Sequence, residues 1–364
     1  MDTHNAQPSQ ATPIIPEHAT SALPILGAED ARFEEYEQKI RGLKRVYVPH
    51  PVARHVLNSL DRLMRYGNLG LEVGSPSRCV LLTGLSGSGK TALLLRWARQ
   101  FGVDTAGLKD RLGVLYVEVP PSCTPKALAE HMLRALGVPE ALVAKGTEVS
   151  LTERVKHHLR EQEVRVVILD EFQHLIDSKS QRVIYRAADF VKGLLNAAIC
   201  PFVLAGTPEA AAVYEENVQL KRRSVGRYSL KPFDWNVQAE QDFFRAAIDE
   251  YEPHLPFGKP SRLARKSIAL RIHYFSNGLF GRAVDLLVAA AIRGLEEGAE
   301  CLSDDLLRET VEDFRDDTNP DWFNPFDSEE LKPLKAPEVD ERRSRVTRLR
   351  KGKRAVRQAD VLPA

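Results

Sequence analysis

The sequence predicts an α/β protein in which a parallel five-stranded sheet is followed by a small all-helical lid. Continuous apolar runs rich in β-branched residues are typical of strands covered on both faces. Segments with helical periodicity separate these runs, as crossovers between parallel strands require. From Gln238 to about Phe314 the periodicity is helical only. The five expected strands are 79–83, 114–119, 164–170, 201–206 and 227–233.

The composition also predicts how the chain is divided. Residues 1–30 are rich in Pro, Ala, Gln and Ser and are expected to form a flexible N-terminal tail. We assign 31–235 to the α/β domain and 236–316 to the helical lid domain. Residues 317–364 are expected to be a linker and a basic tail. Helical spacing begins at Ala31, and the prolines of "VYVPHP" (46–51) interrupt it.

Several classes of protein are excluded by composition. The hydrophobic content of 43% is ample for a core, and the net charge of +1 leaves no global field that would attract nucleic acid. No stretch resembles a membrane span or a signal peptide, so a cytoplasmic protein is expected. The cysteines form no CxxC pair, which makes zinc improbable and indicates reduced thiols. They are Cys79, Cys123, Cys200 and Cys301.

A phosphate-binding motif joins the first strand to the next helix. The stretch "GLSGSGKT" (84–91) fits G-x-x-x-x-G-K-[ST], with a strand before it and a helix after it. Glycines let backbone N–H groups approach phosphates, and the helix N-terminus adds positive charge. Lys90 would neutralise the β- and γ-phosphates; the alternative is a plain helix cap. The expected nucleotide contacts are Gly84, Leu85, Ser86, Gly87, Ser88, Gly89, Lys90, Thr91 and Ala92.

A pair of carboxylates ends the third strand. In "VVILDE" (166–171) Asp170, together with the Thr91 hydroxyl, is predicted to hold Mg²⁺. Glu171 would polarise the attacking water. A surface acid pair would be the structural alternative, but a phosphate-binding loop earlier in the chain favours the catalytic interpretation.

Three further features would complete an ATPase site. Thr207 ends the fourth strand, where its hydroxyl would orient water or sense the γ-phosphate; equally, it could cap the helix that follows. "LKRRSVGR" (220–227) contains Lys221, Arg222, Arg223 and Arg227. One of these could reach a neighbouring subunit's phosphates, or the turn could simply be solvated. Arg282 begins a lid helix and is either a γ-phosphate contact or an exposed first-turn residue.

This order of motifs resembles the AAA+ ATPases, and the details are similar to the TniB/TnsC branch, which regulates DNA transposition. The resemblance covers roughly residues 31–315. His174 in "DEFQHL" occupies the family position, and Arg223 best matches the family's finger arginine. Ser224 replaces the usual aromatic residue after it, which leaves Arg222 as a competitor. The segments that carry the resemblance are 45–64, 117–137, 169–176, 204–210, 217–223 and 276–291.

The resemblance implies an ATP- and Mg²⁺-dependent switch. Such proteins assemble as rings or helical filaments on double-stranded DNA and disassemble on hydrolysis. They present the target DNA to a DDE transposase, often with a TniQ-type target selector. The family's adenine-side loop should lie at Tyr47 and Val48, although the prolines there could merely join two helices. An arginine supplied by the neighbouring subunit would make hydrolysis depend on assembly.

Because the chain is nearly neutral, DNA contact would use only a few Lys, Arg or Thr side chains per subunit. Assembly of many subunits would multiply these contacts along the DNA. The candidates are Thr124, Lys126, Lys179 and Arg182, all in predicted loops where solvated residues are the alternative. The segment 341–357 carries nine Lys or Arg against one Glu. It could bind DNA, an acidic partner or the acidic segment 304–330, or keep the chain soluble.

Two other functions fit the motifs. The first is an AAA+ clamp or helicase loader, or a translocase, whose hydrolysis drives work on DNA. The second is a nucleotide sensor that does not hydrolyse ATP, against which the Asp170–Glu171 pair argues.

Overall fold

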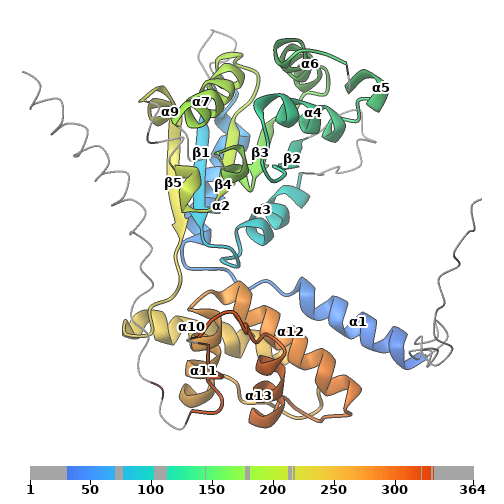
Figure 1. Ribbon diagram of the computed structural model, residues 1–364, viewed down its shortest axis with the longest axis vertical. Helices are drawn as coiled ribbons and strands as arrows, with labels where there is room; N and C mark the ends of the chain where they lie inside the picture. Colours follow the sequence, from blue (N-terminus) through green and yellow to red (C-terminus); the bar gives the residue numbers. More distant parts are fainter. Residues whose placement is uncertain are drawn as a thin grey trace, which may run out of the picture.

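The computed structural model describes residues 31–69, 77–101, 113–143, 145–176, 181–211, 215, 218–320, 322–328 and 331. The predicted N-terminal tail and the basic segment 341–357 therefore lie outside the described residues. The chain forms two units, a sheet covered by helices and a helical unit, which lie end to end (Figure 1). Within the described residues, no helix combines the length and apolar character that a bilayer crossing needs.

The predicted parallel five-stranded sheet is present. Its strand order is β2-β3-β4-β1-β5, and every strand pair is parallel. β5 begins and ends three residues earlier than the sequence predicts, because Ser224 pairs with Cys79 and the ladder stops at Leu230, before Pro232. The strands are β1 (Cys79–Gly84), β2 (Val114–Glu118), β3 (Val166–Asp170), β4 (Phe202–Gly206) and β5 (Ser224–Leu230).

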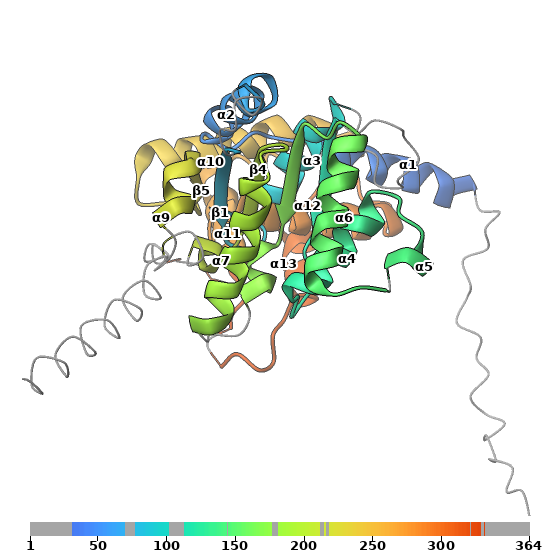
Figure 2. The ribbon, with the colours of Figure 1, turned by 90° about the horizontal axis from the view of Figure 1, so that it is seen from above.

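Helices cover both faces of the sheet (Figure 2). Leu81 of β1 packs in a core cluster with α4 (Pro125–Ala135), α6 (Glu148–Glu161) and α7 (Gln181–Asn196). Its neighbours Val80 and Leu82 pack on the other face, with α2 (Ala53–Tyr66) and α3 (Lys90–Arg99). Because successive side chains of a strand point to opposite faces, both faces of the strand must be apolar. Short segments complete this unit: α5 (Glu140–Val143), α9 (Val218–Arg223) and the 3₁₀ turns η2 (Phe172–Ile176) and η3 (Pro208–Ala210).

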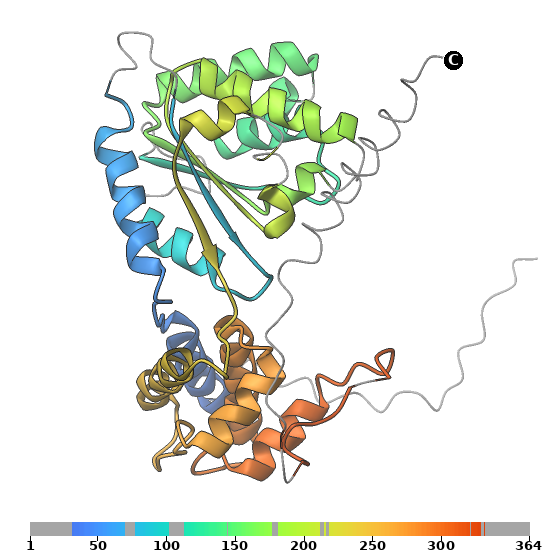
Figure 3. The ribbon, with the colours of Figure 1, turned by 90° about the vertical axis from the view of Figure 1, so that its left-hand side faces the viewer.

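The all-helical unit follows β5 (Figure 3). It contains α10 (Gln238–Tyr251), the 3₁₀ turn η4 (Glu252–His254), α11 (Lys266–Ser276), α12 (Phe280–Glu296) and α13 (Asp304–Glu312). The helical pattern at 260–276 becomes helix only from Lys266, because Arg262 adopts a left-handed backbone with φ 58°. α1 (Ala31–Arg45) packs here too, although it precedes the sheet in sequence. Leu43 of α1 is buried, and its carbonyl accepts a hydrogen bond from Tyr251 at 3.2 Å.

The chain after α13 also lies on the helical unit. The Asn324 side chain is buried and donates to the Arg308 carbonyl oxygen at 2.9 Å. Trp322 and Phe326 pack against the same apolar cluster. The composition of this segment, which we assigned to a linker, gave no indication of these contacts.

Candidate nucleotide-binding and catalytic site

The loop between β1 and α3 forms a tight turn. Gly87 and Gly89 have φ values of 78° and 89°, in the left-handed region that glycine adopts without a Cβ penalty. Gly84 is close-packed, since a Cβ there would lie 2.8 Å from the Leu230 carbonyl oxygen. The loop residues Leu85, Ser86 and Ser88 connect these glycines, and Thr91 and Ala92 continue α3. The turn therefore has the compact backbone that a phosphate cradle requires.

Lys90 lies inside this loop. Its Nζ donates to the carbonyl oxygens of Gly84 and Leu85 at 2.9 Å and 3.1 Å, and only 4% of the residue is exposed. Burial lowers the pKa of the ammonium, while the charges of Glu171 and Asp170 act in the opposite direction. The positive charge is thus held between the loop and the carboxyl end of β3.

Asp170 is the centre of a buried hydrogen-bond network. Its Oδ2 accepts from the Thr91 hydroxyl at 2.7 Å and from the Tyr116 hydroxyl at 2.8 Å. Its Oδ1 accepts from the Glu171 N–H at 2.9 Å. The two groups predicted to hold the metal are therefore adjacent, and both offer the oxygen ligands that Mg²⁺ prefers.

Tyr116 was not among the residues predicted from the sequence. It lies on β2, next to β3 in the sheet, and Tyr116 pairs with Ile168, two residues before Asp170. Burial and the Asp170 carboxylate raise the pKa of the Tyr116 phenol well above its usual range. The phenol therefore stays protonated and donates to Asp170. Only the strand order, which the sequence does not reveal, brings it to this carboxylate.

Glu171 follows Asp170 in a left-handed conformation, with φ 53°. Gln173 Nε2 donates to Glu171 Oε2 in a short hydrogen bond. His174 Nε2 lies 3.9 Å from the same oxygen. The predicted base thus lies immediately before η2, and side chains of that turn lie next to its carboxylate.

Thr207 lies at the carboxyl end of β4. Its N–H donates to Gln173 Oε1 at 2.9 Å, and its hydroxyl makes no capping hydrogen bond to η3. The capping alternative is therefore not adopted, and the hydroxyl is not committed to the turn that follows. Its role toward water or phosphate stays a prediction.

The helical unit touches the phosphate-binding loop at the start of α12. A Cβ built on Gly281 would stand 3.0 Å from the carbonyl carbon of Gly87 and would overlap the carbonyl oxygen. A Cβ on Gly87 would in turn lie 2.7 Å from Arg282 Cγ. The Arg282 guanidinium lies over the ring of Phe275, 5.8 Å from its centroid. Arg282 is exposed in the first turn of α12, beside the loop, and its contact with the γ-phosphate stays a prediction.

Arg222 and Arg223 lie far from the phosphate-binding loop of the same chain. They end α9, and the next residue, Ser224, pairs with Cys79 at the start of β1. The loop follows the other end of β1, five residues or roughly 16 Å away. Arg223 Nη2 donates to Asn196 Oδ1, and burial lowers the pKa of its guanidinium. Arg222 is exposed.

The other two basic residues of this turn, Lys221 and Arg227, both form ion pairs with Glu215. The basic turn is therefore partly neutralised within the chain.

The segment expected on the adenine side bridges the two units. Tyr47 packs against the apolar cluster of the sheet, and the Arg96 guanidinium lies 5.3 Å from its ring centroid. Burial raises the pKa of the Tyr47 phenol to about 12. Val48 packs instead against the helical cluster and lines a pocket of about 270 Å³ whose other wall is α10. Contact of either residue with adenine stays a prediction.

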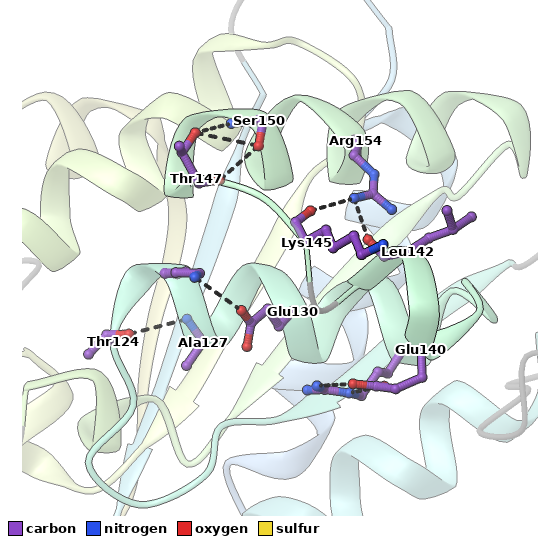
Figure 4. A network of polar contacts seen from close by, with 11 residues as sticks. Thr124, Ala127, Glu130, Glu140, Leu142, Lys145, Thr147, Ser150 and Arg154 are labelled. Carbon is purple, nitrogen blue, oxygen red and sulfur yellow. Dashed lines mark hydrogen bonds and ion pairs between the residues drawn. The ribbon is translucent and has the colours of Figure 1, made fainter.

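The candidate DNA-binding residues that the structure describes make local contacts. Thr124 Oγ1 caps α4 by accepting from the Ala127 N–H at 3.2 Å (Figure 4). Lys126 Nζ lies 3.8 Å from a carboxylate oxygen of Glu130. Lys179 lies outside the described residues, and only the backbone of Arg182 is described. Thr124 thus has a structural role whether or not it meets DNA.

A model of the family described as "Bacterial TniB protein" matches residues 39–231 of the chain. The match covers just over half of the 364 residues and contains both carboxylates and the arginine turn. No curated protein sequence matches the chain.

The chain is also similar to solved structures. The Aeropyrum pernix ORC2 protein in ADPNP–ADP complexes aligns with a TM-score of 0.52 and 19% identity, covering 75% of this chain and 71% of that chain. The Aeropyrum pernix ORC1 protein in complex with DNA gives 0.53 and 17%, with coverage of 76% and 69%. Cdc6p from Pyrobaculum aerophilum gives 0.51 and 17%, with 75% and 70%. At these identities the likeness shows the fold, which is that of the AAA+ ATPases.

Proposed function

Because this chain belongs to the TniB family, we propose that it is an ATPase that assembles on double-stranded DNA and regulates DNA transposition. Assembly in the ATP-bound state, as rings or helical filaments, would present target DNA to a DDE transposase and connect it with a TniQ-type target selector. Hydrolysis would disassemble the complex. The family membership supports the link with transposition, and the site supports the nucleotide chemistry.

The observation that carries the ATPase proposal is the convergence of Lys90, Thr91 and Asp170. A lysine inside a glycine-rich loop, with its charge near two carboxylates, suits the β- and γ-phosphates of ATP. The Thr91 hydroxyl and the Asp170 carboxylate, 2.7 Å apart, fit Mg²⁺ as oxygen ligands. When bound, Mg²⁺ supplies positive charge that offsets the charge of the phosphates.

The remaining residues of the site have distinct tasks in the proposed reaction. The water oxygen forms a bond to the γ-phosphorus while the bond from this phosphorus to the bridging oxygen of ADP breaks. Glu171 accepts the proton that the water releases. Lys90 offsets charge on the phosphate oxygens, and the Thr207 hydroxyl orients the water.

An arginine from a neighbouring copy would complete the site. Arg222 and Arg223 lie at the opposite end of β1 from the phosphate-binding loop, so they cannot reach the phosphates of a nucleotide bound to the same chain. A guanidinium supplied by another subunit would stabilise charge in the transition state. This arrangement explains why turnover would depend on assembly.

DNA contact in this proposal is to the phosphate backbone and carries no sequence information. Because the chain has a net charge of only +1, affinity would come from repeated weak contacts along an assembly. Thr124, Lys126, Lys179 and Arg182 stay the candidates for these contacts, and the basic segment 341–357 is a further one.

Electron microscopy of the protein with duplex DNA and a non-hydrolysable ATP analogue tests the proposal. We expect ordered assemblies on DNA with the parent chain and none with Lys90→Ala, which should lose ATP binding. Glu171→Gln should assemble with ATP itself and persist, because hydrolysis no longer disassembles it. Coating of DNA by Lys90→Ala equal to that of the parent would contradict the proposal. Strand separation or clamp opening driven by steady turnover would show a motor instead.

A further inference from the structure

Gln173 connects the predicted base to the tip of the neighbouring strand. Its Nε2 donates to Glu171 Oε2, and its Oε1 accepts from the Thr207 N–H at 2.9 Å. The first partner lies after β3 and the second after β4, which are adjacent in the sheet. One side chain thus joins two strand ends of the proposed active site.

The amide side chain of Gln173 suits both partners, because its Nε2 donates and its Oε1 accepts. A carboxylate accepts and never donates, whereas a backbone N–H only donates. The two partners therefore fix which end of the amide faces which group. A lysine or arginine here would suit Glu171 but leave the Thr207 N–H unpaired, and a carboxylate would do the reverse.

The backbone of Gly206 leaves room for this amide. A Cβ at Gly206 would overlap Gln173 Oε1 and lie 3.2 Å from the Phe172 backbone nitrogen. The amide is the group that would move, because it is the end of a flexible side chain. The Gln173 amide therefore packs directly against the backbone of Gly206 at the end of β4.

We propose that Gln173 is the residue that positions the Glu171 carboxylate for hydrolysis and ties it to Thr207. This inference rests on the proposed ATPase function and names a positioning residue that the motifs do not include. Gln173 and His174 both approach Oε2 of Glu171. Oε1 is thus the oxygen left to accept the proton of the attacking water.

The link also makes Glu171 and Thr207 move together. Without this link, the Glu171 base and the Thr207 hydroxyl would lie at the ends of separate strands, and each could shift relative to the other. Because the amide bonds the Thr207 backbone rather than its hydroxyl, the hydroxyl stays available to water. The geometry of the two groups is therefore set by one side chain.

Gln173→Met is the first test, because methionine has a similar length and neither donates nor accepts strongly. We expect kcat for DNA-stimulated ATP hydrolysis to fall roughly 10- to 100-fold, the effect of losing a hydrogen bond to a charged group. The dissociation constant for ATP should stay that of the parent. The matched control is Gln162→Met, which removes an amide that donates to the Leu136 carbonyl oxygen away from the site.

Gly206→Ala is the second test, since it keeps the amide but displaces it. It should lower kcat by a factor similar to that of Gln173→Met. If both changes act through the amide, the double variant should be no slower than either single one. Independent effects would multiply instead.

Three results would overturn the inference and leave the proposed function standing. They are a kcat of Gln173→Met equal to that of the parent, a loss of kcat equal to that of Gln162→Met, and effects that multiply in the double variant. Absence of DNA-stimulated turnover in the parent chain would overturn both. Loss of turnover with unchanged ATP affinity and no added loss in the double variant would support the inference.

Discussion

Gly281, in the first turn of α12, lies directly against the backbone of Gly87 in the phosphate-binding loop. A Cβ on Gly281 would stand 3.0 Å from the Gly87 carbonyl carbon and overlap its oxygen. Because the atoms of Gly87 in this contact belong to the backbone, they cannot move aside as the end of a flexible side chain can. The helical unit thus contacts the loop through two residues without side chains, and Arg282 is held next to Gly87 by that contact.

Replacing Gly281 with alanine should separate lid and loop. We expect ATP affinity to fall about 10-fold, because relieving such an overlap typically costs about 1–3 kcal/mol. Binding of a fluorescent ATP analogue measures the change. Gly193→Ala is the matched control, since this helical glycine has open space around its Cβ position. It should keep parental affinity; equal affinities for all three chains would rule out a functional lid contact.

Tyr116→Phe should weaken the metal site. The change removes one of the two hydroxyl donors to Asp170 Oδ2 and leaves the Thr91 hydroxyl in place. Loss of a group that orients a metal ligand typically lowers metal affinity 10- to 100-fold. The Mg²⁺ concentration for half-maximal turnover should therefore rise about 10-fold. Tyr228→Phe, whose hydroxyl pairs with Ser59 instead, should not change it; an unchanged Mg²⁺ requirement in Tyr116→Phe would exclude this role.

The fold and the nucleotide motifs were predictable because both are encoded locally. The glycine spacing before Lys90 and the acid pair after an apolar run are visible in short windows of sequence, and the first four strands follow from their apolar runs. The fifth strand is less apolar, and it lies three residues earlier than the sequence predicts. Tyr116 and Gln173 were not predictable. Tyr116 reaches Asp170 only because β2 and β3 are adjacent, and Gln173 reaches Thr207 only because β4 lies next to β3.

The packing of chain segments at a distance was equally invisible. α1 has a helical pattern, but nothing in it indicates that Leu43 would pack against helices more than 200 residues later in the chain. Similarly, the prolines and acidic residues near Asn324 are typical of a linker, yet its amide is buried against α13. Such contacts depend on surfaces that form only after the helical unit has folded.

His273 should make the helical unit sensitive to acid. Its side chain is 2% exposed, lies 2.7 Å through Nε2 from the Phe233 carbonyl oxygen, and packs on Trp235 and Phe244. Burial lowers its pKa below the usual 6.5, although Phe233, Asp234 and Glu240 act in the opposite direction.

As the pH falls below about 6.5, the unfolded chain binds a proton before the folded one does. The free energy of unfolding should therefore decrease, by at most about 1.4 kcal/mol per pH unit from this group. Chemical denaturation at pH 5.5 and 7.5 measures the effect. In His273→Gln, which keeps a donor for Phe233, the pH dependence should be smaller; the same dependence in both chains would refute the assignment.

Arg223 and Glu171 should belong to active sites that two subunits share. Arg223→Ala retains its base but lacks an arginine to give its neighbour, whereas Glu171→Gln retains the arginine but lacks the base. Each chain alone should turn over ATP at least 100-fold more slowly than the parent, because loss of a transition-state arginine costs about 10³–10⁵ in rate. Mixed in equal amounts on duplex DNA, they should recover turnover, since Glu171→Gln copies supply the arginine to sites whose base is intact. A second mixture, in which Arg222→Ala replaces Arg223→Ala, decides between the two arginines. Only the variant that lacks the arginine entering the neighbouring site should lose turnover alone and recover it when mixed with Glu171→Gln. A mixture no faster than its separate components would show that neither arginine acts between subunits.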